Sequence, residues 1–185
     1  ASFDGKTFTS VDHPGVAPKP FLRPAFEAKK EAAIKSIGVK VWVLIKKEEI
    51  PWTSLIEDNT LNGWEIKGGN ATYSIDKGVI TGTTVSNTPN TFLSTIKHYD
   101  DFILELEYKV DPSMNSGIQI RSNSLPHYRD GMVHGYQIEI DPSKRAWSAG
   151  IYDEKRRKWL NTLKNNPDAQ KAFKQNEWNH YRIEA

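Results

Sequence analysis

The sequence predicts an all-β domain, built as a two-sheet sandwich or jelly roll, behind an N-terminal leader that contains one helix. Three observations predict it. From Trp52 onward, short runs of residues alternate between apolar and polar side chains. Turn-forming residues separate these runs. The runs are rich in β-branched and aromatic residues, which favour strands. Many short antiparallel strands in succession are typical of sandwiches and jelly rolls.

The first fifty residues differ in character from the rest. Residues 1–50 hold nine Lys/Arg and six Asp/Glu, whereas residues 51–185 hold sixteen and seventeen. Strong helix formers from Ala25 to Ile37, with Gly38 directly after them, predict a helix. The β-branched run Val39–Ile45 predicts a strand. We therefore divide the chain into a leader, residues 1–50, and a β domain, residues 51–185.

The predicted strands of the β domain share alternating hydrophobicity. They cover Ala71–Asp76, Val79–Val85, Asn90–Thr95, Phe102–Val110, Gly117–Ser122, Tyr136–Asp141, Trp147–Glu154 and Trp178–Ala185. Lys77-Gly78 predicts a hairpin turn. Asp168–Gln175 predicts one short helix, with Asn166-Pro167 as its cap and first turn. The last strand reaches the final residue, so we expect the domain to be cut short at its C-terminal end.

Composition excludes several classes of protein. The formal charge is only +2, whereas a dedicated nucleic-acid binder carries a strong basic excess. The chain has no cysteine, which excludes disulfides, thiolate metal sites and cysteine nucleophiles. Its longest apolar run, Val41–Ile45, is far too short to span a membrane. Phosphate-binding glycine motifs, the nucleophile elbow and the zinc-protease motif are missing. The sequence predicts no cofactor and no metal.

Polar residues of one kind recur on three predicted strands. They are Glu105 and Glu107, then Gln119 and Arg121, then Gln137, Glu139 and Asp141. If these strands are adjacent, one sheet face carries rows of carboxylates, amides and a guanidinium. A solvated outer face is one interpretation. The other is a concave sugar-binding face, which the planar side chains favour because they form paired hydrogen bonds with hydroxyls.

Aromatic residues gather in the same third of the chain, namely Tyr128, Tyr136, Trp147, Tyr152 and Trp159. Aromatic side chains are more often core, but sugar rings also stack on them. Two histidines, His127 and His134, flank the loop in this region. A metal site built on His134, Glu139 and Asp141 is conceivable, but its spacing matches no specific ligand pattern.

A series of motifs resembles a known family over residues 51–185. The motifs are Leu61–Trp64, Gly68-Gly69, Asp76–Gly82, Asn90–Leu93, Tyr99–Phe102, Asn115–Ser122, Gly135–Asp141, Gly150–Glu154, Arg157–Leu160 and Trp178–Arg182. In this order they resemble the 3-keto-disaccharide hydrolase domain. That resemblance implies a concanavalin-like two-sheet jelly roll with a carbohydrate cleft. It also implies a secreted or periplasmic glycan-processing enzyme that acts on 3-keto-glycosides. The segment Ser54–Asn59 departs from the family's usual pattern.

A second, shorter resemblance lies in the leader. Residues 10–38, with His13–Gly15 and Pro18–Phe26, resemble the C-terminal part of phage tail-completion proteins. A tail structural protein that carries a sugar-binding module is therefore one alternative function. A lectin-like module that binds glycan without cleaving it is another.

The resemblance suggests a mechanism in which a ketone at C3 of the sugar acidifies the proton on C2. We expect Glu139 and Asp141 to act as base and acid, Arg121 to polarise the keto oxygen and His134 to be an alternative acid. Substrate-binding candidates are Glu105, Glu107, Asn115, Gln119, Gln137, Trp147 and Tyr152. The expected partner is a saccharide, with no nucleic acid and no membrane span; the oligomeric state stays open.

Overall fold

The computed structural model describes residues 36–44 and 52–185, which all belong to one unit, Lys35–Ala185. The helix predicted for Ala25–Ile37 lies mostly outside the described residues, as does most of the segment that resembles tail-completion proteins. Its last two residues, Ser36 and Ile37, are strand residues that pair with Thr83 and Gly82. The strand predicted from Val39 therefore begins earlier, at Ser36.

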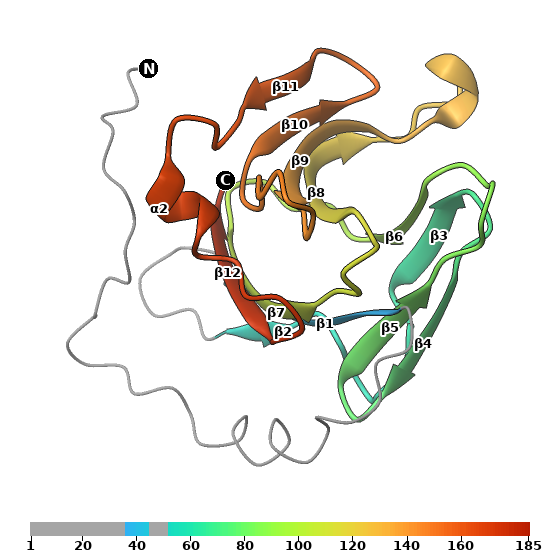
Figure 1. Ribbon diagram of the computed structural model, residues 1–185. Coiled ribbons are helices and arrows are strands. Elements are labelled where there is room, and N and C mark those ends of the chain that lie inside the picture. Colours follow the sequence, from blue (N-terminus) through green and yellow to red (C-terminus); the bar gives the residue numbers. More distant parts are fainter. Residues whose placement is uncertain (1–35, 45–51) are drawn as a thin grey trace. The chain divides into compact units, whose positions relative to one another are not determined.

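The described residues form mostly antiparallel β-structure in three sheets (Figure 1). The first sheet has the order β12 (Asn179–Glu184), β7 (Ile103–Lys109), β1 (Ser36–Leu44), β5 (Val79–Thr83) and β4 (Thr72–Asp76), with β2 (Thr53–Ser54) paired to β1. The second has the order β11 (Lys158–Asn161), β10 (Ile151–Glu154), β9 (His134–Ile140) and β8 (Ser116–Asn123). The third pairs β3 (Trp64–Gly68) with β6 (Thr91–Thr95). A 3-10 turn, η1 (Arg129–Gly131), and one short helix, α2 (Pro167–Gln170), complete the described elements.

The hairpin predicted at Lys77-Gly78 is confirmed. Asp76 of β4 pairs with Val79 of β5, which leaves a two-residue turn. Lys77 and Gly78 have φ angles of 49° and 73°, as a type I′ turn requires. The Gly78 N–H donates to Oδ1 of Asn59 at 2.8 Å, so the turn is tied to the loop that precedes β3.

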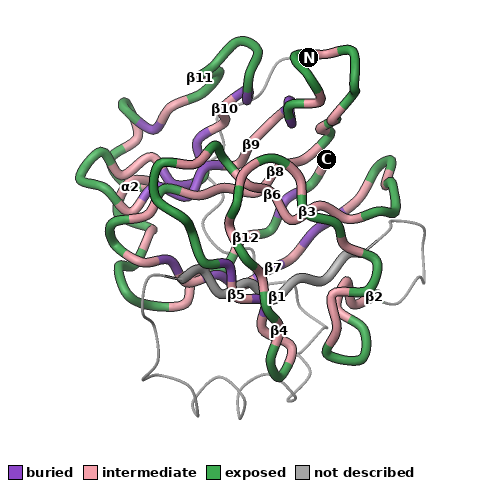
Figure 2. Tube along the Cα trace, turned by 90° about the vertical axis from the view of Figure 1, so that its right-hand side faces the viewer, coloured by how far each residue is buried: buried purple, intermediate pink, exposed green. Residues whose placement is uncertain are grey.

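The core joins the first two sheets. Along β7 the predicted alternation is confirmed, with Leu106 and Tyr108 almost fully buried. They belong to one cluster with Ile140 of β9 and Ile183 of β12. Figure 2 shows buried segments, in purple, along β7 and β9. Ile118, Ile120 and Ile138 of the second sheet pack against the same cluster. Ile138 and Ile140 of β9 thus face the core, and Glu139 between them faces away from it.

Two predicted elements are shorter than the sequence suggests. The Asn166 cap is confirmed, since its Oδ1 accepts from the Ala169 N–H at 3.1 Å, but α2 ends at Gln170 rather than Gln175. The strand predicted from Trp147 begins only at Ile151, because Gly150 N donates to Trp147 O at 2.9 Å and closes a turn. The sequence pattern did not predict β3 and β11 as strands, since neither run alternates clearly.

Candidate functional site

The outward face of β8 and β9 carries a row of hydrogen-bonded amides. The strand register sets Gln119 opposite Gln137 and Gly117 opposite Glu139. Oγ of Ser122 donates to Oε1 of Gln119 at 2.8 Å, and Nε2 of Gln119 donates to Oε1 of Gln137 at 2.9 Å. Nε2 of Gln137 then donates to Oε2 of Glu139 at 2.8 Å. All three bonds point the same way, toward the carboxylate.

Glu139 is the carboxylate on which this row ends. The residue is only 3% exposed. Besides Gln137, it accepts from Nδ2 of Asn115 at 2.6 Å and from Nη2 of Arg145 at 3.3 Å, both at Oε1. Buried carboxylates need such donors, because a buried charge without partners is costly. The three donors hold the Glu139 carboxylate in one orientation.

Arg145 links Glu139 to the second predicted carboxylate. Its Nε donates to Oδ2 of Asp141 at 2.7 Å. Asp141 is 2% exposed, and it also accepts from Ser143 Oγ at 2.6 Å and from the Trp147 N–H at 3.2 Å. Burial raises the pKa of Asp141, but the hydrogen bonds from Ser143, Arg145 and Trp147 outweigh it and lower that pKa below its usual value. Asp141 is therefore ionised at neutral pH and organises the loop that carries Arg145.

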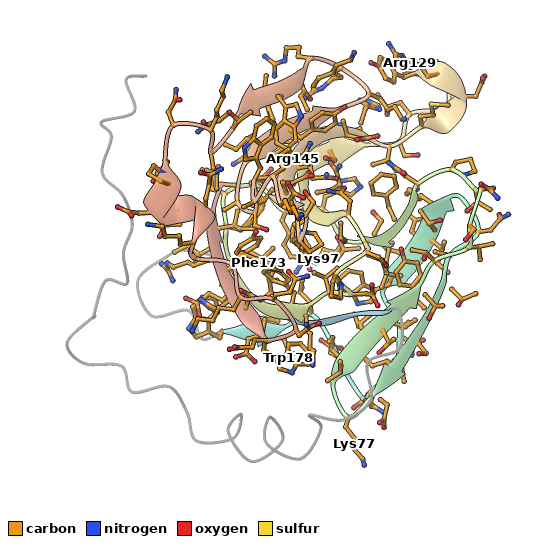
Figure 3. All side chains as sticks on the ribbon, viewed as in Figure 1. Lys77, Lys97, Arg129, Arg145, Phe173 and Trp178 are labelled. Carbon is orange, nitrogen blue, oxygen red and sulfur yellow. The ribbon has the colours of Figure 1, made fainter. Side chains whose placement is uncertain are left out.

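Aromatic residues flank Arg145. Its guanidinium carbon lies 4.8 Å from the ring centre of Trp147 and 4.9 Å from that of Trp159. Trp159 also makes edge contacts with Trp147, at 4.9 Å between ring centres, and with Tyr152, at 5.2 Å. Tyr152 pairs with Gln137 across β9 and β10, so it belongs to the same face as Glu139. The structure thus brings Trp147 and Tyr152 together with the predicted polar residues (Figure 3, Arg145).

A pocket of about 210 Å³ adjoins the row of amides on β8 and β9. Asn115 and Gln137, two donors to Glu139, are part of its wall, and Tyr73 and Phe92 supply aromatic surface. Burial raises the pKa of Tyr73, so its phenol is neutral, and its OH donates to Thr91 O at 3.1 Å. Gly117 also lines the pocket. A Cβ at this position would overlap Cγ and Cδ of Gln137.

Two predicted binding residues lie elsewhere. β8 and β9 are adjacent, as the sequence analysis considered, but β7 belongs to the first sheet and pairs with β1 and β12. Glu105 therefore contacts Arg182 of β12, with Nη1 of Arg182 at 2.6 Å, rather than the amide row. Glu107 lies on the same strand, opposite His180. Alternation predicted which residues of a strand share a face, but it could not show to which sheet the strand belongs.

Arg121 and His134 are also separated from Glu139. A bulge interrupts β8 after Ile120, and Arg121 has a φ of 45°. Its Nη2 donates to Asp101 Oδ1 at 2.8 Å. His134 precedes Glu139 by five positions on β9, so alternation places it on the opposite face. Its ring lies 4.0 Å from that of Tyr128. Within the described part of the chain no three His, Cys, Asp or Glu side chains are grouped so that they could hold a metal.

Sequence reasoning missed three residues of the site, Arg145, Tyr73 and Phe92. Arg145 follows Asp141 by four positions in a loop, and no strand pattern covers it. Phe92 belongs to the motif Asn90–Leu93, which was used only for the resemblance. Tyr73 falls in a predicted strand, but its alternation does not show that its OH reaches Thr91 O of β6 beside the pocket.

These features define an antiparallel β domain with a buried, fully hydrogen-bonded carboxylate between a small pocket and an aromatic cluster. Comparison with family models matches residues 51–185 to the 3-keto-alpha-glucoside-1,2-lyase-like domain. The chain belongs to this family, which confirms the resemblance seen in the sequence. No curated protein matches the chain. Among the described residues, no helix is both long and apolar enough to cross a membrane.

Proposed function

We propose that this protein cleaves 3-keto-glycosides, with Glu139 as the base that removes the C2 proton of the sugar. One observation carries the proposal. Asn115 and Gln137 both line the pocket, and both donate to the Glu139 carboxylate. The carboxylate therefore adjoins a pocket in a domain whose family is named for a 3-keto-glucoside lyase.

The proposed chemistry is a β-elimination. The C3 ketone acidifies the C2–H bond, and Glu139 takes that proton while the electron pair moves to the keto oxygen as an enolate. The enolate then re-forms the ketone, a C1–C2 double bond forms, and the glycosidic C1–O bond breaks. The protonated Glu139 returns its proton to the leaving oxygen, so one carboxyl serves as base and then as acid. Addition of water to C1 of the enone would complete a net hydrolysis.

Arg145 takes the role that the sequence suggested for Arg121. The Arg145 side chain is 40% exposed, and its Nη2 lies 3.3 Å from Oε1 of Glu139. A fixed cation at that place stabilises an enolate oxygen. Asp141, whose pKa is lowered, is a positioning residue for Arg145 rather than a proton donor. Gln119 and Gln137 each use one N–H of the side-chain amide within the row, and each offers the second N–H to a ring hydroxyl.

The two parts of the substrate, the 3-keto sugar and the leaving group, occupy two different regions of the site. We assign the 3-keto sugar to the cluster of Trp147, Tyr152 and Trp159, beside Arg145. The leaving group then lies in the pocket beside Asn115 and Gln137. We further propose that the first two sheets, which share one core, form the concanavalin-like jelly roll of the resemblance, and that the protein acts in the periplasm or outside the cell.

The test is turnover of a 3-keto-glucoside by Glu139→Gln. General-base catalysis contributes about 10²–10⁴-fold, so we expect kcat to fall by about that factor while the circular dichroism spectrum is unchanged. Glu65→Gln, an exposed residue on β3, is the control and keeps full activity. Wild-type turnover by Glu139→Gln would show that another group is the base. Sugar binding by the wild-type protein without any product would favour the lectin-like alternative instead.

A further inference from the structure

The hairpin turn between β10 and β11 carries four consecutive cations. Lys155, Arg156, Arg157 and Lys158 are all exposed, and Lys158 pairs with Asp153 across the hairpin. A run of charges in a turn is often only a solvated surface. Here, however, three of the four side chains have acidic partners: Lys155 pairs with Glu154 at 3.4 Å, and Arg156 and Arg157 share Asp153.

Asp153 holds the two arginines. It is fully buried, and its two carboxylate oxygens accept from Nε of Arg156 and Nε of Arg157, each at 2.6 Å. The guanidinium carbons lie 5.0 Å and 5.6 Å from the ring centre of Tyr136, whose OH accepts from Nη2 of Arg157 at 3.1 Å. One carboxylate cannot neutralise two guanidiniums. The pair is therefore pre-positioned and retains one net positive charge.

A second segment brings a fifth cation to this end of the sheet. Tyr128 OH donates to Lys155 O at 3.1 Å, which ties the segment before η1 to the hairpin turn. The guanidinium carbon of Arg129, a residue labelled in Figure 3, lies 5.6 Å from the ring centre of Tyr128. We call the five cations Arg129, Lys155, Arg156, Arg157 and Lys158 the basic end.

The basic end stands out against the charge of its domain. Three acidic residues lie in the same two segments, namely Asp130, Asp153 and Glu154. The other residues between 51 and 185 comprise eleven Lys/Arg and fourteen Asp/Glu. The domain thus concentrates positive charge at one place and is acidic elsewhere. Such a distribution attracts polyanions to one surface without giving the whole chain a basic charge.

We propose that the basic end binds an acidic polysaccharide through its uronate carboxylates. Paired, planar guanidiniums match the geometry of carboxylates. Tyr136 alternates with Gln137 on β9, so the surface lies on the opposite face from Glu139 and is a separate site. Its function does not depend on the proposed catalysis. A nucleic-acid surface is less favoured, since single strands need open aromatic faces for stacking, and arginines lie over Tyr128 and Tyr136.

The experiment measures binding of polygalacturonate to the whole protein, with neutral dextran and single-stranded DNA as comparison polymers. The main variant is Arg129→Gln/Lys155→Gln/Lys158→Gln, which leaves the contacts of Asp153 intact. The control, Lys164→Gln/Lys171→Gln/Lys174→Gln, removes the same number of charges from exposed positions elsewhere. A second variant, Arg156→Gln/Arg157→Gln, tests the arginine pair, with its fold checked by circular dichroism.

We expect the wild-type protein and the control to bind polygalacturonate at low salt, and neither to bind dextran. The triple variant at the basic end should bind at least tenfold more weakly. Binding should also weaken with salt, since exposed charges are screened. The proposal is wrong if the wild-type protein does not bind polygalacturonate, if both triple variants lose affinity equally, or if DNA binds more tightly than polygalacturonate.

Discussion

Nε2 of Gln137 lies 2.8 Å from Oε2 of Glu139, and this contact fixes which way both side chains face. Because Oε1 of Gln137 accepts from Gln119, the Gln137 amide cannot flip without losing both bonds. The register that sets Gln119 opposite Gln137 thus decides the orientation of the proposed base. A chain of like-directed hydrogen bonds of this kind holds a carboxylate more firmly than its single contacts would.

Gly117→Ala should impair the site while keeping the fold. The added Cβ would overlap Cγ and Cδ of Gln137, so that side chain has to move. Moving it breaks the bond to Glu139 and narrows the pocket. We expect kcat/KM on a 3-keto-glucoside to fall about tenfold or more, which corresponds to about 1.4 kcal/mol.

Ser74→Ala, at an exposed position on β4 that does not line the pocket, is the control. It should keep the wild-type kcat/KM. Wild-type activity in Gly117→Ala would mean that the orientation of Gln137 is unimportant for catalysis.

The sequence predicted most strands correctly because alternation is a local property. β7, with Leu106 and Tyr108 buried and Glu105 on the other face, shows this most clearly. Alternation does not report which strands pair. For that reason alternation alone allows Glu105 to lie beside Gln119, whereas β7 pairs with β1 and β12.

The candidate site was predictable where it lies on regular strands and unpredictable where it does not. Gln119, Gln137 and Glu139 occupy one face of two paired strands, as expected. Arg121 lies apart from this row, because a bulge with a positive φ re-aims its side chain toward Asp101. Arg145 comes from a loop whose shape depends on the hydrogen bonds of Asp141, and no periodic pattern describes such a loop.

Arg145→Lys should lower activity although it keeps the positive charge. A lysine has one nitrogen, so it cannot contact Asp141 and Glu139 as the guanidinium does. It also loses the planar contact with Trp147 and Trp159. We expect kcat/KM to fall about ten- to a hundredfold, or about 1.4–2.8 kcal/mol. The neighbouring exchange Lys144→Arg should have no effect; equal effects of the two exchanges would contradict a specific role for Arg145.

Stability should fall in acid through Asp141. Its pKa is lowered in the folded protein, chiefly by hydrogen bonds from Ser143 and Arg145 that outweigh the opposing effect of burial. A lowered pKa means that the unfolded chain binds the proton more readily, so stability is lost as pH decreases. The stabilisation is fully present above the unfolded value of about 3.9 and is lost as pH falls through the folded pKa.

Urea unfolding between pH 7 and pH 2.5 measures this effect. Asp141→Asn should be less stable than the wild type at pH 7, and the difference should shrink as pH falls below about 4. Asp168→Asn, at an exposed position of α2, should follow the wild-type curve at every pH. A difference between Asp141→Asn and the wild type that stays constant with pH would show that the Asp141 charge does not contribute.

Leu106→Ala should be strongly destabilising, because Leu106 is fully buried at the centre of the core that joins β7 to β9 and β12. Removing a buried leucine side chain leaves a cavity and costs about 2–5 kcal/mol of unfolding free energy. Leu160→Ala, at a position that is 42% exposed on β11, is the control and should cost far less. Urea midpoints with unchanged slopes would measure both.

Because Tyr181 of β12 lies in this core and its OH donates to Glu139 O at 2.7 Å, the Leu106 variant should also lose activity at temperatures below its unfolding transition. Similar losses of stability in the two leucine variants would mean that β7 is not the centre of the core.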